Sequence, residues 1–107
     1  MMQLEFIQDR VAQLRAQKGV SAREMSLAIG QNGSYINRIE NKKALPSLAG
    51  LFYICEYLGV TPREFFDEGN NDPERLSAVV LDLKKLDSVT FDHVAAMVRE
   101  LSGKRKT

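Results

Sequence analysis

Residues 20–40, with the sequence VSAREMSLAIGQNGSYINRIE, constrain the fold more than any other stretch, because they predict two short helices joined by a tight turn. Ser21 is suited to cap the first helix and Asn32 the second, since short polar side chains accept hydrogen bonds from the free N–H groups of a helix start. Gly30 lies between them and tolerates the positive φ that such a turn requires. Apolar residues recur on one face of each helix. The pattern indicates a helix-turn-helix, or an ordinary helical hairpin within a core, which has the same hydrophobic spacing.

The outward face of the second predicted helix is polar and carries one cation. It presents Gly33, Ser34, Tyr35, Asn37 and Arg38. Hydroxyl, amide and guanidinium groups can hydrogen-bond to base edges and to phosphates in the major groove of DNA. This face is therefore the first candidate for a functional surface.

The segments around this motif resemble the Cro/C1-type helix-turn-helix family, also called the XRE family. The similar segments are IQDRVAQLRAQKGVS before the turn, YINRIE after it, and then ALPSLAGLFYICEYLGVTPREFF, so the resemblance extends from about Ile7 to Phe66. It implies an all-α fold, with a five-helix, lambda-repressor-like DNA-binding domain. It also implies that the partner is double-stranded DNA.

The resemblance implies two kinds of DNA contact. Positions that face base edges in the family are occupied by Asn32, Gly33, Ser34 and Arg38. Positions that hold phosphates are occupied by Tyr35, Asn41 and Lys43, and by the backbone N–H groups near Ala22. Arg38 is the best candidate for a specific contact, because a guanidinium can span guanine O6 and N7. The complete set of candidate DNA-binding residues is Ala22, Arg23, Asn32, Gly33, Ser34, Tyr35, Asn37, Arg38, Asn41, Lys42 and Lys43.

Three of these residues depart from the family pattern. Gly33 stands where relatives often carry glutamine or arginine, so direct base reading is expected to be lost there. Ala22 stands where the family often has a glutamine that grips the backbone. Lys42 stands where many relatives have glycine, so either Asn41 or Lys42 must take the left-handed conformation that follows the recognition helix.

The family also commonly pairs two charged positions between the first and third helices, which we assign to Arg10 and Glu40. A partly buried bridge of this kind would fix the recognition helix on its scaffold more than it would raise stability, because desolvation offsets much of the Coulomb attraction. The alternative is that the two residues are unrelated surface charges.

Charge is distributed unevenly, although the net charge of the chain is only +1. Residues 10–43 carry seven basic and two acidic side chains, whereas residues 56–74 carry six acidic side chains and one basic. A basic segment that faces phosphate and an acidic segment that faces away would orient the protein on DNA. The alternative is a solvated face, where charge runs are also common.

Helical spacing predicts five further helices, and Gly69, Asn70 and Asn71 break the pattern between the fifth and sixth helices of the chain. We place the domain boundary at this break, with a DNA-binding domain at 1–69 and a C-terminal helical hairpin at 70–107. The further helices are expected at about 4–18, 48–58, 62–66, 72–86 and 88–101.

The short turn around Asp87 predicts that the last two helices pack antiparallel. Two amphipathic helices alone cannot bury their apolar faces, so they must dock on the first domain or on a second copy of the chain; the length of the stripe favours a homodimer. The tail GKRKT is expected to be disordered, with Lys104, Arg105 and Lys106 adding weak attraction to phosphate. Candidate dimerisation residues are Leu76, Val80, Leu83, Phe91, Val94 and Val98.

Other classes of function have little support. The N-terminus lacks a signal-peptide pattern and no stretch approaches a membrane span, so the cytoplasm is expected. Cys55, the single cysteine, is expected to be a buried apolar residue, and His93 has no neighbouring ligand, so neither a metal nor another cofactor is expected. No catalytic constellation is visible. The expected function is that of a dimeric DNA-binding repressor. The alternatives are an antitoxin with a protein partner and a helix-turn-helix used only for protein contact.

Overall fold

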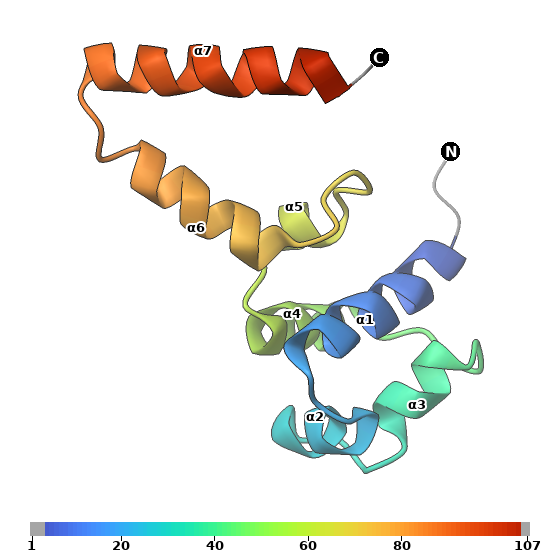
Figure 1. The fold of residues 1–107 in the computed structure, drawn as a ribbon. Helices are drawn as coiled ribbons and strands as arrows, with labels where there is room; N and C mark the ends of the chain where they lie inside the picture. The colour runs from blue at the N-terminus through green and yellow to red at the C-terminus, as the bar shows by residue number, and fades with distance from the viewer. Residues whose placement is uncertain (1–3, 106–107) are drawn as a thin grey trace. The chain divides into compact units, whose positions relative to one another are not determined.

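The computed structural model describes residues 4–105, with side chains as far as Gly103, and this part of the chain is helical without strands. The helices are α1 (Glu5–Lys18), α2 (Ala22–Ala28), α3 (Tyr35–Glu40), α4 (Leu48–Leu58), α5 (Pro62–Phe65), α6 (Pro73–Leu83) and α7 (Ser88–Arg105) (Figure 1). No helix in the described range is both long and apolar enough to cross a membrane.

The chain divides into two compact units between Glu74 and Arg75. This division lies after the break at Gly69 that we expected to be the boundary. Asn70 and Pro73 are buried, so the segment that follows the break packs with the first unit. The glycine and asparagines therefore belong to the loop between α5 and α6 and do not end the domain.

The first unit has a single hydrophobic core formed by the inward faces of α1 to α5. Phe65 of α5 is fully buried and makes edge-to-face contacts with Phe6 and Phe66. Cys55 is buried as expected, and burial raises the pKa of its thiol. The core consists of Val11, Leu14, Met25, Ile36, Ile39, Leu51, Ile54, Cys55, Leu58, Val60 and Phe65.

Local signals in the sequence account for the ends of the helices in this unit. Ser47 caps α4 by accepting a hydrogen bond from the N–H of Gly50, and Gly59 ends that helix with φ 73°. Thr61 and Glu64 form the capping box that begins α5. These devices set the lengths of the helices that support the motif.

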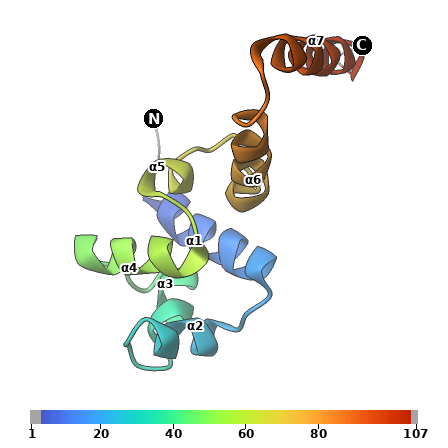
Figure 2. The same ribbon diagram turned by 90° about the vertical axis from the view of Figure 1, so that its left-hand side faces the viewer.

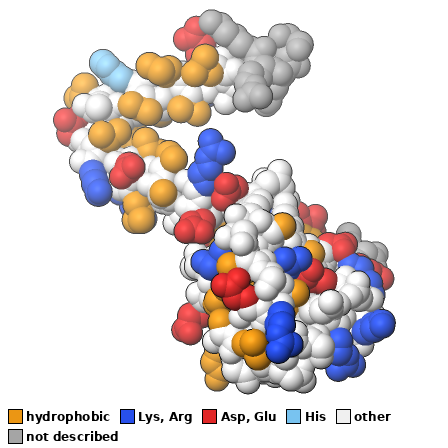
Figure 3. Space-filling view, turned by 60° about the horizontal axis from the view of Figure 1, so that its bottom comes forward, with side chains coloured by type: hydrophobic (Ala, Val, Ile, Leu, Met, Phe, Trp, Pro, Cys, Tyr) orange, Lys and Arg blue, Asp and Glu red, His pale blue; other side chains and the backbone are white. Residues whose placement is uncertain are grey.

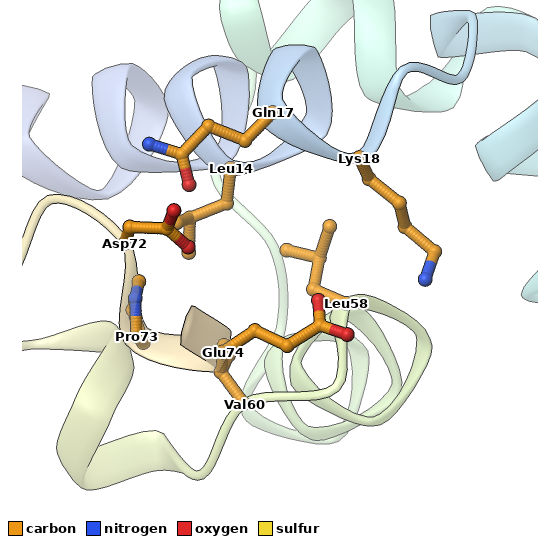
Figure 4. Close-up of a pocket in the computed structure, with 8 residues that line it drawn as sticks. All are labelled: Leu14, Gln17, Lys18, Leu58, Val60, Asp72, Pro73 and Glu74. Atoms are coloured by element: carbon orange, nitrogen blue, oxygen red, sulfur yellow. The ribbon is translucent and has the colours of Figure 1, made fainter. Parts of the chain in front are cut away.

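A small pocket of about 80 Å³ lies in the first unit, between α1, the end of α4 and the beginning of α6 (Figure 4). Leu14 and Leu58 line it together with the charged residues Lys18 and Glu74. Its volume is far below that of the usual small-molecule site. We therefore interpret it as a packing feature beside the segment that joins the two units.

The second unit contains α7 and nearly all of α6, and its helices differ from the predicted hairpin. Asp87 begins α7 by accepting a hydrogen bond from the N–H of Thr90 at 2.8 Å. From that turn α7 diverges from α6 (Figure 1), so the expected antiparallel packing along the two helices is wrong. Apolar side chains on both helices, such as Leu76 and Val98, remain more than half exposed. Helices α6 and α7 therefore do not bury their apolar stripes against each other.

The C-terminal end also differs from expectation. Helix α7 continues through Gly103 to Arg105, so the expectation of disorder from Gly103 onward is wrong for these residues. The side chains of Lys104 and Arg105, and the whole of Lys106, lie outside the part of the chain that the structure describes.

Candidate DNA-binding surface

Helices α2 and α3 lie side by side in both ribbon views, joined by the predicted tight turn (Figures 1 and 2). Ser21 caps α2 by accepting a hydrogen bond from the N–H of Glu24 at 2.9 Å, as predicted. Gly30 has φ 78°, and its N–H and that of Gln31 donate to carbonyls in the last turn of α2. This is a Schellman motif, the arrangement for which glycine is the favoured residue.

The start of α3 differs from the prediction. The helix begins at Tyr35, with Ser34 at the N-cap position, so Asn32 does not cap it. Instead the Oδ1 atom of Asn32 accepts hydrogen bonds from the backbone N–H of Ser34 at 3.0 Å and from its hydroxyl at 2.8 Å. Asparagine closes such turns with its own side chain. Asn32 therefore fixes the turn that leads into α3.

Ser26 is a supporting residue that sequence reasoning missed. Its hydroxyl is completely buried, donates to the carbonyl of Ala22 at 2.7 Å and accepts from the N–H of Ile36 at 2.9 Å. One serine of α2 thus satisfies a free N–H group in the first turn of α3. The available signal was a hydroxyl beside apolar residues on the inward face of a helix.

The expected ion pair between Arg10 and Glu40 is wrong, because the partner of Glu40 is Arg15. The Arg15 guanidinium donates from Nε at 2.6 Å and from Nη2 at 2.9 Å to the two carboxylate oxygens of Glu40. These hydrogen bonds raise the pKa of Arg15. Its Nη1 atom also donates to the carbonyl of Val20, so one side chain of α1 joins the start of the motif to the end of α3.

Arg10 lies elsewhere and is not a surface charge. It is only 2% exposed, and its guanidinium donates to the carbonyls of Phe65 and Glu64, both at 2.8 Å. Burial lowers the pKa of Arg10. Arg10 therefore holds α5 against α1, whereas Arg15 holds α3.

The end of α3 is a second Schellman motif, in which Lys42 takes the place of glycine. Lys42 has φ 66°, so it is the lysine rather than Asn41 that adopts the left-handed conformation. Its N–H donates to the carbonyl of Ile39 at 3.1 Å, and the N–H of Lys43 donates to that of Arg38 at 2.9 Å. This turn directs the chain from the recognition helix into the loop that carries two adjacent lysines.

The polar candidates lie on the outer side of this scaffold. Arg38 and Lys43 are exposed, and neither forms a hydrogen bond or ion pair through its side chain within residues 4–105. Lys42 forms an ion pair with Asp9, and the side-chain amide of Asn41 donates to Asn37. Figure 3 shows basic side chains on the face of the first unit that includes α2 and α3.

The remaining candidates differ in their exposure to solvent. Tyr35 is partly buried, which raises its pKa, and its hydroxyl lies 2.6 Å from the position that a Cβ atom would take at Gly50. That hydroxyl thus lies at the first turn of α4. Ala22 is also partly buried, at the first position of α2, and Arg23 extends over Gly33. Asn32 and Ser34 are exposed.

The candidate dimerisation residues are in the second unit, where the structure brings four of the six together. Leu83, Phe91, Val94 and Val98 line an apolar groove of about 350 Å³ on α7 and the end of α6. Leu76 and Val80 do not line this groove and are exposed nearer the start of α6.

A helix-turn-helix family model matches residues 11–65, which is just over half of the chain and includes α2, the turn and α3. The chain belongs to the Cro/C1-type helix-turn-helix family, the XRE family, and is therefore a DNA-binding helix-turn-helix regulator. No curated protein and no solved structure matches the chain.

Proposed function

We propose that this protein is a sequence-specific transcriptional repressor that binds double-stranded DNA as a dimer, with Arg38 as its main base-reading residue. The observation that carries the proposal is that Arg38 is exposed and has no partner in the described chain, while the helix that presents it is fastened at both ends by Ser26 and Glu40. A guanidinium on a rigid support can pair bidentately with guanine. Repression then needs only occupancy of the operator.

Phosphate contacts would orient α3 in the groove. The backbone N–H groups at the first turn of α2, near Ala22, form one anchor, since a helix start attracts anions. The loop after α3 supplies the other through Asn41 and Lys43, both of which are exposed. These contacts would hold the recognition helix in register without selecting a sequence.

Dimerisation would be provided by the second unit. One helix-turn-helix reads a short half-site, and dimers of this class read two half-sites about one helical turn apart. The groove around Leu83 and Val98 offers an apolar surface that a second copy of α6 and α7 would cover. Covering it would also bury the apolar side chains that α6 and α7 leave exposed.

Selection of bound sequences from a random DNA pool tests the DNA-binding part of the proposal. We expect the wild type to select an operator with two symmetric half-sites. Arg38→Ala should no longer select this operator, although the melting temperature of the variant should stay close to that of the wild type. The matched control is Arg63→Ala, which removes an exposed arginine from α5. If Arg38→Ala still selected the operator of the wild type, or if both variants lost this selectivity equally, the assignment of Arg38 would be refuted.

Sedimentation of the full chain at micromolar concentration tests the dimer. The wild type should be a dimer, Val98→Asp a monomer, and Val89→Asp a dimer, because Val89 is exposed but lies outside the groove. A monomeric wild type would refute dimerisation through this surface. It would favour a role for the groove in binding a different protein, as in an antitoxin.

A further inference from the structure

The side chain of Arg23 occupies the space that a side chain at residue 33 would take. Gly33 lies in the turn before α3 and is only partly exposed although it has no side chain. A Cβ atom built on Gly33 would lie 3.1 Å from Cζ and 3.4 Å from Cγ of Arg23, and would collide with its Nη1 atom. The guanidinium from α2 thus lies over the approach to the recognition helix.

No hydrogen bond or ion pair among the described residues explains this position. Arg23 is the second residue of α2, and a cation in the first turn of a helix is disfavoured by the helix dipole. Within residues 4–105 its guanidinium forms no hydrogen bond or ion pair, and the residue is exposed. The Arg23 guanidinium thus lies where the helix dipole disfavours it, and none of its N–H donors is used by the described residues. It is therefore suited to bind an acceptor outside the protein.

We propose that Arg23 supplies the base-reading group that Gly33 lacks. This inference rests on the proposed function, because it assumes that α3 enters the major groove. Residue 33 stands at a position that faces base edges in the family, and here the group above that position is a guanidinium that belongs to α2. Its donors match the O6 and N7 acceptors of a guanine, so Arg23 specifies a second G·C pair in addition to the pair that Arg38 reads.

The Arg23 side chain and a Cβ atom at residue 33 cannot occupy the same space. This provides a test in which Arg23 is displaced without being removed. Gly33 does not have a positive φ, so alanine fits the backbone at this position. The added methyl group of Gly33→Ala would meet the far end of a flexible side chain, so the fold persists and Arg23 moves aside. Gly33→Ala should therefore change specificity in the same way as Arg23→Ala. Gly69→Ala is the control, because its Cβ would meet only open space and one carboxylate oxygen at 3.9 Å.

The experiment compares sequence selection and affinity for the full-length wild type, Arg23→Ala, Arg23→Lys, Gly33→Ala and Gly69→Ala. We expect the first three variants to lose roughly 5- to 150-fold of discrimination at one G·C pair of each half-site, as loss of one bidentate contact would cause. The other positions and the melting temperature should stay unchanged, and Gly69→Ala should behave as the wild type.

Two results would overturn the inference. If Arg23→Ala weakened binding to all sequences equally, Arg23 would contact only phosphate. If Gly33→Ala kept the full preference at that pair, the position over Gly33 would be irrelevant. In both cases the wild type would still select an operator that depends on Arg38. Failure of the wild type to select any sequence would instead refute the proposed function.

Discussion

Replacement of Arg10 by methionine should destabilise the first unit strongly although it touches no candidate DNA contact. Arg10 donates from Nε to the carbonyl of Phe65 and from Nη2 to that of Glu64, and it reaches the carbonyl of Asp67 at 3.3 Å. These carbonyls lie at and just beyond the last turn of α5; those of Glu64 and Asp67 also accept turn hydrogen bonds from the N–H groups of Asp67 and Asn70. A cation at that end of a helix is also favoured by the dipole.

The magnitude follows from these contacts. Hydrogen bonds from a charged donor contribute about 1.5–3 kcal/mol each, and Arg10 makes three at 2.8 Å, to the carbonyls of Phe65 and Glu64 and to the side-chain oxygen of Gln13. Methionine would fill the volume of the aliphatic stem and avoid the desolvation of a buried charge, which offsets part of the loss. We expect Arg10→Met to lower the free energy of unfolding by about 2–4 kcal/mol. For a domain of this size that corresponds to a melting temperature lower by about 10–25 °C.

Urea and thermal unfolding followed by far-UV circular dichroism would measure this effect. Arg63→Met is the matched control, because it removes the same charge from an exposed position on α5, and its effect should stay within about 0.5 kcal/mol. If Arg10→Met were as mild as Arg63→Met, the guanidinium would not be holding α5 on α1, and the reasoning would be wrong.

Three further predictions concern single residues. Lys42→Gly should raise the free energy of unfolding by roughly 0.5–1 kcal/mol in urea, because the left-handed conformation costs lysine more than glycine; a destabilised variant would argue against strain there. The thiol of Cys55 is buried and its pKa is raised, so it should react with a thiol reagent only as fast as the chain opens, and rapid labelling of the native protein would contradict this. The hydrogen bond that Asp87 accepts at the start of α7 lowers its pKa below the ordinary value of 3.8, so the charged form stabilises the helix. Its contribution should be complete above that value and be lost as the pH falls through the lower folded pKa, which is seen if the difference in helix content between the wild type and Asp87→Ala shrinks there.

Features that depend on a few neighbouring residues could be predicted from the sequence. The cap at Ser21, the left-handed turn at Gly30 and the capping box at Thr61 all follow from short-range hydrogen bonding and from the steric freedom of glycine. The need for a left-handed residue after α3 could be predicted in the same way. The choice of Lys42 over Asn41 could not, because both residue types can adopt that conformation at some cost.

Features that depend on the orientation of α1 could not be predicted. Arg10 and Arg15 are both basic residues of one helix, and spacing alone does not say which of them faces α3. The structure turns Arg15 toward Glu40 and Arg10 toward α5. The position of Arg23 over Gly33 likewise could not be predicted from the sequence, because it depends on how α2 packs against the turn.

The recognition helix cannot hold its own conformation. With the six residues Tyr35–Glu40 it is far shorter than the roughly 12–15 residues at which an isolated helix becomes even marginally stable in water. Its order comes from buried Ile36 and Ile39, from the ion pair of Glu40 with α1 and from the hydroxyl of Ser26. The geometry of base reading is thus determined by residues that do not touch DNA.

Ser26→Ala tests this dependence, because it removes one of these supports without changing any polar group on the outer surface. It should lower the free energy of unfolding by about 1–3 kcal/mol, since the buried N–H of Ile36 loses its partner. Under conditions in which the variant is fully folded, it should also bind its operator more weakly, with the loss concentrated at the pair that Arg38 reads, because a helix freed at its first turn no longer holds the guanidinium in register. Ser88→Ala, at the exposed first residue of α7 and outside the apolar groove, should change neither quantity. If Ser26→Ala lost stability but kept the operator affinity of the wild type, packing by Ile36 and Ile39 alone would be sufficient to orient the helix.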